Sequence, residues 1–359
     1  MQGSIGEAYV GTMPVPEKHR LALDRLEAYL STRIPGLAGP LSAQQFRGGQ
    51  SNPTYRIDAA DARYVLRRKP PGKLLPSAHA VDREYRVMTA LHGSDVPVPK
   101  TWCLCEDESV IGTAFYVMEY VDGRVLWDPS LPGMSNDGRG AIFDEMNRVI
   151  AALHRLDYRT LGLEDFGRIG GYLARQIARW TKQYRASETE RIEAMERLIE
   201  WLPENIPEGD ETSIVHGDYR LDNLVFHPRE PRIIAVLDWE LSTLGHPLAD
   251  FAYHCMSWRI PGGTFRGMLG LDLSGLGIPE EPDYVASYCR RLGLGPIDPR
   301  DWDFYIAYNM FRAAGIAQGI MGRARDGTAS SAHAIEAGRS ARAMAERGWQ
   351  QVERIVGRR

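Results

Sequence analysis

Residues 214–223 read IVHGDYRLDN, an apolar run that leads into the pattern H-x-D-x-x-x-x-N and ends at Asn223. Fifteen positions later a second apolar run, residues 233–237, ends in Asp238. A carboxylate that ends a buried strand lies where it reaches into a cleft, and a cleft between two lobes is a natural ligand site. The pattern therefore predicts that Asp218, Asn223 and Asp238 form one polar site.

These side chains suit transfer of a phosphoryl group from ATP, which requires in-line geometry and neutralisation of phosphate charge. We expect Asp218 to accept the proton of a hydroxyl acceptor. Asp238 and Asn223 offer oxygen ligands of the kind that Mg²⁺ prefers, so we expect them to bind the metal. His216 is expected to hydrogen-bond the backbone and shape the loop. The alternative is a hairpin whose Asp and Asn side chains only form turns, with His216 a core histidine.

The chain changes character along its length. Strand patterns dominate the N-terminal third, whereas helical apolar spacing dominates from residue 141 onward, with one β-rich island at residues 214–239 that holds a hairpin. This order predicts an α+β, bilobal fold with a small β-rich N-lobe and a large, mostly helical C-lobe. We place the nucleotide-binding lobe at 1–118, the hinge at 119–123, and the helical lobe, with catalytic loop and acceptor site, at 124–359.

Apolar periodicity gives the bounds of the expected elements. Strands are expected at residues 44–47, 54–58, 63–69, 101–105 and 115–120. Helices are expected after Pro16 and at residues 77–92, 141–156, 171–184, 190–201, 249–258, 282–292, 302–321 and 331–356.

The strand expected at residues 63–69 carries side chains suited to nucleotide binding. Val65 and Arg67 share one face of it, because side chains alternate along a strand. An apolar residue two positions before a cation suits contact with adenine and then with the α- and β-phosphates. Glu84, seventeen residues after Arg67, lies on a predicted helix and is expected to pair with it. The alternative is that Arg67 and Glu84 are solvated surface charges.

Two further segments are candidates for nucleotide contacts. The turn Gly-Gly-Gln-Ser-Asn at residues 48–52 lets backbone N–H groups approach phosphates, which makes Ser51 and Asn52 cofactor-binding candidates. An apolar strand runs into the connector, where backbone groups of Glu119 and Val121 are expected to bind the adenine edge. A plain hairpin turn and an ordinary buried strand end are the alternatives.

Taken together, these segments resemble the aminoglycoside phosphotransferase and choline kinase-like group of the protein-kinase-like fold. The resemblance runs over about residues 46–253, and within the group it is greatest to the kinase-like domain associated with acyl-CoA dehydrogenases. It is carried by residues 46–52, 65–79 (VLRRKPPGKLLPSAH), 110–124, 216–228 (HGDYRLDNLVFHP) and 237–253 (LDWELSTLGHPLADFAY).

The resemblance implies a role for each candidate residue. Asp218 would be the catalytic base, with Asn223 and Asp238 as the Mg²⁺ ligands. Arg67 and Glu84 would form the ion pair of the N-lobe. The fold would be the bilobal protein-kinase-like fold, and the cofactors would be ATP and Mg²⁺.

The resemblance also implies a hinge at residues 119–121, a buried carboxylate at Asp250 that braces the catalytic loop, and a structural role for His154. The sequence departs from well-studied kinases at Arg67, where they carry Lys, and guanidinium and ammonium groups differ in geometry. Asp238 is followed by Trp-Glu rather than Phe-Gly, and no A-P-E segment follows. A protein substrate is therefore not expected.

The C-terminal residues favour an apolar or anionic acceptor over a polycationic aminoglycoside. The last 99 residues carry 13 Arg and no Lys against 11 Asp and Glu. A hydroxylated acyl thioester of coenzyme A suits this composition, and Asn309 and Arg312 are candidate acceptor contacts. The alternative is that the arginines are surface residues and that a set of aromatic residues belongs to the core: Trp302, Phe304, Tyr305, Tyr308 and Phe311.

Net charge and the distribution of apolar residues indicate which classes of partner to expect. The net charge of −4 does not favour a nucleic-acid partner. Residues 1–13 lack the charged and apolar regions of a secretory signal, and no apolar stretch approaches the roughly 20 residues of a membrane span. We therefore expect a cytoplasmic protein whose partners are ATP and a small-molecule hydroxyl acceptor. The sequence indicates no oligomeric state.

Three other functions stay open at this point. The first is a catalytically silent, nucleotide-binding pseudokinase module, against which the intact set Asp218, Asn223 and Asp238 argues. The second is a dehydrogenase, but the chain after Tyr253 is short for a flavin-binding domain and no dinucleotide fingerprint follows a strand. The third is a protein kinase, which would need a glycine-rich loop and an activation segment.

Overall fold

The computed structural model describes residues 11–47, 52–60, 62–71, 80–264, 266–326 and 334–358. The chain forms two compact units. The first contains Met1–Val149, Arg159–Leu163 and Arg220–Ser242, and the second contains Ile150–Tyr158, Glu164–Tyr219 and Thr243–Arg359. The hinge expected at residues 119–123 lies inside the first unit, so the boundary between the expected lobes stays a prediction.

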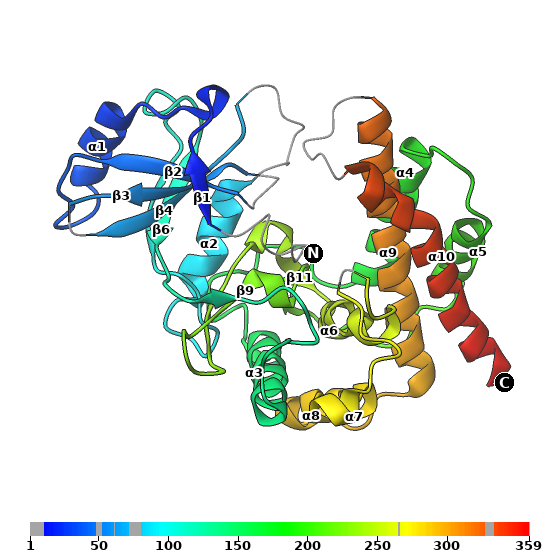
Figure 1. The fold of residues 1–359 in the computed structure, drawn as a ribbon. Helices are drawn as coiled ribbons and strands as arrows, with labels where there is room; N and C mark the ends of the chain where they lie inside the picture. The colour runs from blue at the N-terminus through cyan, green and yellow to red at the C-terminus, as the bar shows by residue number, and fades with distance from the viewer. Residues whose placement is uncertain are drawn as a thin grey trace. The chain divides into compact units, whose positions relative to one another are not determined.

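The first unit is built on a six-stranded antiparallel sheet with the strand order β1-β2-β3-β4-β6-β5 (Figure 1). The strands are β1 (Thr12–Pro14), β2 (Ser42–Phe46), β3 (Thr54–Asp58), β4 (Arg63–Arg68), β5 (Thr101–Cys105) and β6 (Phe115–Glu119). The five strands that the sequence predicts are all present, and periodicity missed only the three residues of β1, which are too few to show a pattern.

Two helices accompany this sheet. The short η2 (Glu17–His19) precedes α1 (Leu23–Ser31), whose apolar stripe is buried in one cluster with β3. Helix α2 (Val81–Leu91) contacts β5 and β6 and buries its own apolar stripe. Neighbouring residues of a strand point to opposite faces, so Arg68 points into the apolar cluster, over the ring of Tyr55, whereas Arg67 points toward Glu84 of α2.

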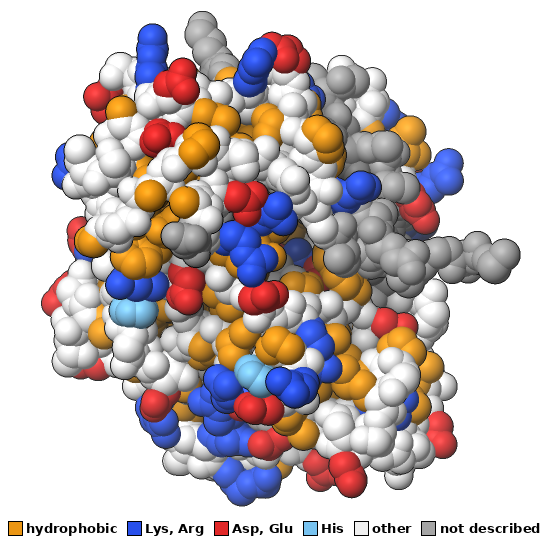
Figure 2. All heavy atoms as spheres, turned by 60° about the vertical axis from the view of Figure 1, so that its left-hand side comes forward, with side chains coloured by type: hydrophobic (Ala, Val, Ile, Leu, Met, Phe, Trp, Pro, Cys, Tyr) orange, Lys and Arg blue, Asp and Glu red, His pale blue; other side chains and the backbone are white. Residues whose placement is uncertain are grey.

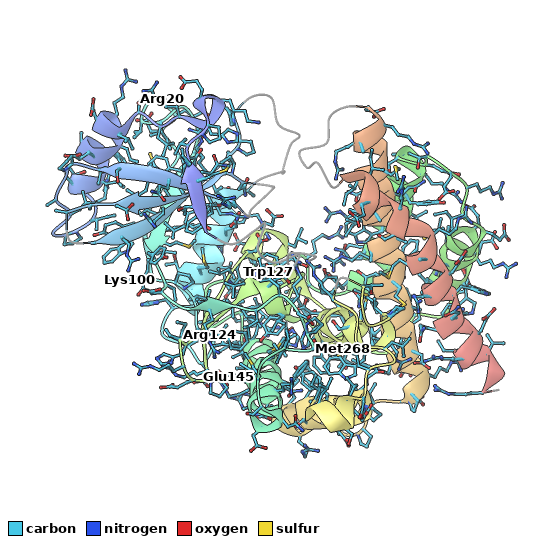
Figure 3. The ribbon with its side chains drawn as sticks, viewed as in Figure 1. Arg20, Lys100, Arg124, Trp127, Glu145 and Met268 are labelled. Atoms are coloured by element: carbon cyan, nitrogen blue, oxygen red, sulfur yellow. The ribbon has the colours of Figure 1, made fainter. Side chains whose placement is uncertain are left out.

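A smaller sheet of the first unit, with the order β10-β9-β7, holds the predicted hairpin. It consists of β7 (Arg124–Val125), β9 (Leu224–Phe226) and β10 (Ile233–Val236). Figure 3 labels two side chains that fix the hairpin, Arg124 and Glu145. Arg124 donates to the carbonyl of His227 at 3.0 Å, and Glu145 of α3 (Asn136–Arg155) accepts from the amide of Ile233 at 3.1 Å.

The second unit is mostly helical. Besides the C-terminal end of α3, its helices are α4 (Tyr172–Ala186), α5 (Glu193–Glu204), α6 (Pro247–Cys255), η5 (Met256–Arg259), α7 (Leu273–Leu276), α8 (Glu281–Leu292), α9 (Pro299–Arg325) and α10 (Ala334–Gly357). Helix α9 is the central one: α4, α5, α6 and α10 all contact it, and α10 runs alongside it (Figure 1). The α+β fold class, with a strand-rich N-terminal region and a mostly helical C-terminal region, is confirmed.

The β-rich island expected at residues 214–239 contains three strands that belong to two sheets. Strands β9 and β10 form the hairpin, whereas β8 (Ser213–Val215) does not join it. It pairs with β11 (Thr243–Gly245), which follows the island. Each of these strands has three residues, so pairing between segments far apart in sequence decides the arrangement rather than local periodicity.

No helix in the described part of the chain is both long enough and apolar enough to cross a bilayer. Figure 2 shows one face of the molecule, on which acidic and basic side chains are interspersed.

Candidate active site

The hairpin of the first unit brings Asn223 and Asp238 together. Asn223 ends the short helix η3 (Leu221–Asn223), and its carbonyl accepts a hydrogen bond from the amide of Leu237 at 2.8 Å. Asp238, the next residue, has φ 64° and ψ 59°, in the left-handed region that non-glycine residues seldom adopt. Such backbone strain clusters at functional sites.

Arg67 connects three carboxylates of the first unit. Its Nη2 lies 2.8 Å from Oδ1 of Asp238 and 3.1 Å from Oε2 of Glu240, and its Nε lies 2.9 Å from Oε2 of Glu84. The Arg67 side chain is only 9% exposed. Burial alone would lower the pKa of Arg67, but Glu84 and Asp238 raise it well above its ordinary value. Arg67 therefore stays cationic.

Glu84 is the most deeply buried of these carboxylates, at 1% side-chain exposure. Asn52 Nδ2 donates to its Oε1 at 2.9 Å, and the Tyr116 hydroxyl donates to its Oε2 at 3.0 Å. Burial raises the pKa of Glu84, although Arg67 opposes the shift. The structure thus directs Asn52 to Glu84. Ser51 lies outside the described residues.

Sequence reasoning missed Tyr116 and Glu240. Tyr116 pairs in register with Arg67 across β4 and β6, so its position depends on the sheet register. Glu240 stands two residues after Asp238, and that spacing was the available signal.

The donor set of the hairpin fits Mg²⁺. Within the described residues, no three His, Cys, Asp or Glu side chains form a metal-binding group. Mg²⁺ is usually held by one or two carboxylates, with phosphate oxygens and water completing its octahedron. The carboxylate of Asp238 and the amide oxygen of Asn223 match that requirement, and Arg67 already lies against Asp238 where a second cation would bind.

Of the residues expected near adenine, Val65 and Glu119 lie on the neighbouring strands β4 and β6, and Val121 follows β6. Val65 of β4 is buried and pairs with Met118 of β6. At the end of β6, the amide of Glu119 donates to the carbonyl of Lys100 at 2.8 Å. Contacts of Val65, Glu119 and Val121 with a nucleotide stay predictions.

The loop that carries Asp218 belongs to the second unit and is held by Asp250 of α6. The His216 amide donates to Asp250 Oδ2 at 2.7 Å, and the Gly217 amide donates to Oδ1 at 2.8 Å. His216 Nδ1 in turn accepts from the Asp218 amide at 3.1 Å. Gly217 has φ 82°, a conformation that costs glycine little.

His154 supports Asp250 from α3. Its Nε2 lies 3.2 Å from Asp250 Oδ2, and its Nδ1 lies 2.6 Å from the hydroxyl of Tyr288. Burial alone would raise the pKa of Asp250, but His154 and His216 hold it below its ordinary value. Asp250 therefore stays an anion that accepts from two loop amides.

Two residues contact the Asp218 segment from α6 and α9. The Tyr253 hydroxyl donates to Asp218 Oδ1 at 2.5 Å, and Arg312 Nη2 donates to the Gly217 carbonyl at 2.6 Å. Sequence reasoning missed Tyr253, although its position three residues after Asp250 puts both on one face of a helix. Asn309, the other residue considered for the acceptor, donates to the carbonyl of Ala249 at 2.8 Å.

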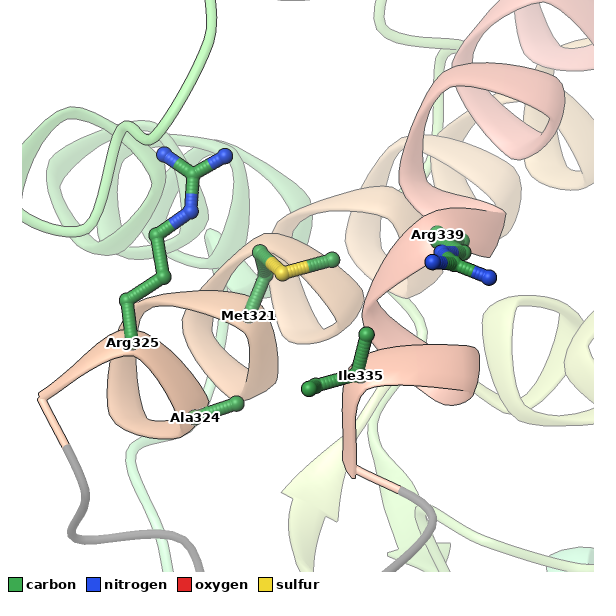
Figure 4. A pocket seen from close by; sticks show the side chains of 5 residues that line it. All are labelled: Met321, Ala324, Arg325, Ile335 and Arg339. Atoms are coloured by element: carbon green, nitrogen blue, oxygen red, sulfur yellow. The ribbon is translucent and has the colours of Figure 1, made fainter.

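A pocket of about 300 Å³ lies between the end of α9 and the start of α10 (Figure 4). It is lined by Met321, Ala324, Arg325, Ile335 and Arg339. None of these is a predicted site residue, so the pocket contributes nothing to the assignment of the active site.

Known proteins resemble this chain in sequence and in structure. A crystal structure from Ralstonia eutropha, named for aminoglycoside phosphotransferases, has 59% identity and a TM-score of 0.86, covering 93% of this chain and 99% of that one. Acyl-CoA dehydrogenase family member 10 of Mus musculus is 49% identical over 94% of this chain and 32% of its own length. The chain spans less than half the length of the curated relatives it matches.

A more distant structure shows the fold alone. It is a thermostable mutant of aminoglycoside phosphotransferase APH(4)-Ia in ternary complex with AMP-PNP and hygromycin B, with a TM-score of 0.59 and 16% identity over 91% of this chain and 98% of that one. The resemblance expected from the motifs is confirmed. Residues 42–308 match the model of the phosphotransferase enzyme family, so the chain belongs to this family.

Proposed function

We propose that the chain is a Mg-ATP-dependent kinase that transfers the γ-phosphate of ATP to a hydroxyl of a small molecule. One observation carries the proposal: both carboxylates that the chemistry requires are present, and each is held in place. Asp238 lies against Arg67 in the first unit, and Asp218 accepts from Tyr253 in the second. Family membership and the AMP-PNP bound to the distant structure support ATP as the donor.

In this reaction Asp218 accepts the proton of the acceptor hydroxyl. The hydroxyl oxygen forms the new bond to the γ-phosphorus as the bond from that phosphorus to the β–γ bridging oxygen breaks and ADP leaves. Asp238 and Asn223 would hold Mg²⁺, which neutralises phosphate charge. We expect Arg67 to contact the α- and β-phosphates.

We propose a hydroxylated acyl thioester of coenzyme A, or an acceptor similar to it, as the substrate. The excess of arginine over lysine in the last 99 residues, 13 against none, favours an anionic acceptor. Relatives named as acyl-CoA dehydrogenase family members add support, because their substrates would carry the same thioester. The five aromatic residues of α9 give no support, since all are buried in the core.

A pseudokinase module is the second candidate. Arg67 stands where a lysine is expected and lies on three carboxylates. If Arg67 kept Asp238 from binding Mg²⁺, the chain would bind nucleotide without transferring phosphate.

The test measures nucleotide binding and ADP release with the same preparation. Mg-ATP affinity is measured by calorimetry, and ADP release is followed with hydroxyacyl-CoA, choline-like amines and an aminoglycoside as acceptors. Stimulation by hydroxyacyl-CoA alone is expected. Stimulation by a cationic acceptor would overturn the substrate class but keep the kinase. Binding without any stimulation would favour the pseudokinase, and absence of ATP binding would overturn both.

A further inference from the structure

Three contacts connect Asp218, Tyr253, Arg312 and Gly217 in a closed circuit. The Tyr253 hydroxyl donates to the carboxylate of Asp218, and the guanidinium of Arg312 lies 4.9 Å from the centre of the Tyr253 ring. Arg312 also donates to the carbonyl of Gly217, the residue before Asp218. One arginine therefore contacts both the backbone next to Asp218 and the aromatic ring that binds its carboxylate.

Arg312 is built into the unit rather than placed on its surface. It is 6% exposed, and its guanidinium lies 5.6 Å from the ring centre of Trp180 on α4. Burial alone would lower the pKa of Arg312, but Tyr308 and Tyr172 lead the groups that raise it. The side chain is thus a fixed cation held between aromatic rings, an arrangement in which cation–π attraction is strongest because water is excluded.

Both backbone polar groups of Gly217 are hydrogen-bonded. Its amide donates to Asp250 and its carbonyl accepts from Arg312. These bonds fix the backbone but not the side chain of Asp218, because the last torsion of an aspartate is broad. A donor to one carboxylate oxygen restricts this torsion, and the Tyr253 hydroxyl supplies such a donor at 2.5 Å.

We propose that Tyr253 and Arg312 are positioning residues that set the orientation of the Asp218 carboxylate toward the acceptor hydroxyl. The inference rests on the proposed role of Asp218 as the base. Tyr253 restricts rotation of the Asp218 carboxylate, and Arg312 holds the ring of Tyr253 and the carbonyl before Asp218. Neither residue needs to touch the nucleotide or the acceptor.

The first test is Tyr253→Phe, which keeps the ring against Arg312 and removes only the hydroxyl. We expect kcat to fall about 10- to 100-fold, because small errors in the placement of reacting groups have effects of that size. The KM for ATP and the melting temperature should stay unchanged. Tyr284→Phe is the matched control: it removes another buried hydroxyl of the same unit, one that bonds His254, and should change kcat less than about twofold.

A double-mutant cycle separates positioning from a general structural role. If Tyr253 acts through Asp218, Tyr253→Phe should have almost no further effect on the residual rate of Asp218→Asn, since residues that act as one unit are non-additive. Arg312→Met should lower kcat as Tyr253→Phe does, and Arg312→Lys, which keeps the cation, should restore part of it.

The outcomes distinguish this inference from the proposed function. If the wild-type enzyme transfers phosphate and Tyr253→Phe matches it in kcat, the positioning role is wrong and the kinase stands. Full additivity of Tyr253→Phe with Asp218→Asn would also overturn it. If the wild-type enzyme transfers phosphate to no acceptor, the proposed function fails first and the inference fails with it.

Discussion

The two carboxylates proposed for catalysis lie in contrasting surroundings. In the first unit, Asp238 lies 2.8 Å from a guanidinium nitrogen of Arg67, which also contacts Glu84 and Glu240. In the second unit, Oδ1 of Asp218 accepts from the neutral hydroxyl of Tyr253. Asp238 is bonded directly by a cation, whereas Asp218 is bonded by a phenol whose ring lies against the cation Arg312.

The difference matches the two proposed roles. A cation stabilises a carboxylate more than a neutral donor does. A metal ligand tolerates this, because one cation can take the place of another beside it. A general base must accept a proton during the reaction, so a neutral donor orients it at a smaller cost to its basicity. Charge therefore organises the surroundings of Asp238, and aromatic packing organises those of Asp218.

The largest expected effect comes from removing the cation of the charged region, which consists of Arg67 and its partners Glu84, Asp238 and Glu240. Arg67→Met would leave the buried Glu84 carboxylate without its cation and should lower the free energy of unfolding by about 3–5 kcal/mol, as loss of one partner of a buried ion pair does. Chemical denaturation measures it. Arg63→Met, on the same strand, is the control, because Arg63 pairs with Asp122 at 48% exposure and its loss should cost less than about 1 kcal/mol. Equal costs would contradict the account.

The second effect tests whether His254 stays neutral in the aromatic region, the buried rings of the second unit around the Asp218 segment. His254, in ring contact with Tyr219 and bonded to Tyr284, lies near Asp250, yet burial lowers its pKa from 6.5 to about 4. Below pH 6.5, His254 binds a proton in the unfolded chain but stays neutral in the folded chain. The free energy of unfolding therefore decreases as pH falls from about 6.5 to about 4. A shift of this size corresponds to about 3 kcal/mol.

Urea denaturation across that pH range measures the effect of His254. His254→Asn should flatten the pH dependence, whereas His92→Asn removes an exposed histidine and serves as control. A wild-type stability that does not fall between pH 6.5 and 4 would contradict burial of a neutral histidine.

The third effect sharpens the role of Asp238. Asp238→Asn keeps the size of the side chain and removes the charge that Mg²⁺ needs, so Mg-ATP affinity should fall about 10- to 100-fold, or about 1.4–2.7 kcal/mol. Calorimetric titration at several Mg²⁺ concentrations measures it. Affinity for ATP without Mg²⁺ should change much less, and equal losses with and without the metal would argue against a ligand role.

The smallest effect concerns the support of Glu84. Asn52→Ala removes the donor to Glu84 Oε1 and should cost about 1–2 kcal/mol of stability, because a buried acceptor loses a partner. Asn205→Ala is the matched control, since Asn205 Nδ2 donates to the carbonyl of Trp201 at a half-buried position. Thermal denaturation of both variants tests whether the bond from Asn52 to Glu84 stabilises the fold. A larger loss of stability in Asn205→Ala than in Asn52→Ala would contradict that role.

Local pattern predicted the charged region well. Alternation along β4 put Val65 and Arg67 on one face, and apolar periodicity put Glu84 on the helix that follows. The ion pair between them, at 2.9 Å, has the expected partners. Five of the six strands of the large sheet were equally accessible, because each spans five or six residues, whereas β1 spans three and was missed.

The aromatic region was not accessible in the same way. Tyr253 and Arg312 reach the Asp218 segment from 35 and 95 residues away in sequence, and both contacts depend on how α6 and α9 pack. Arg312 was considered only as an acceptor contact. The strands β7 and β11 were missed for a related reason, since two or three residues carry no periodicity and only pairing defines them.

The most direct test of the account is single-turnover phosphate transfer by Asp218→Asn, with the Mg-ATP dissociation constant measured on the same preparation. Asparagine keeps an oxygen for Tyr253 but cannot act as a base. We expect transfer to fall by about 10²- to 10⁴-fold while the dissociation constant changes less than about twofold. Retained transfer, or loss of nucleotide binding in step with transfer, would contradict the role of Asp218 as the base.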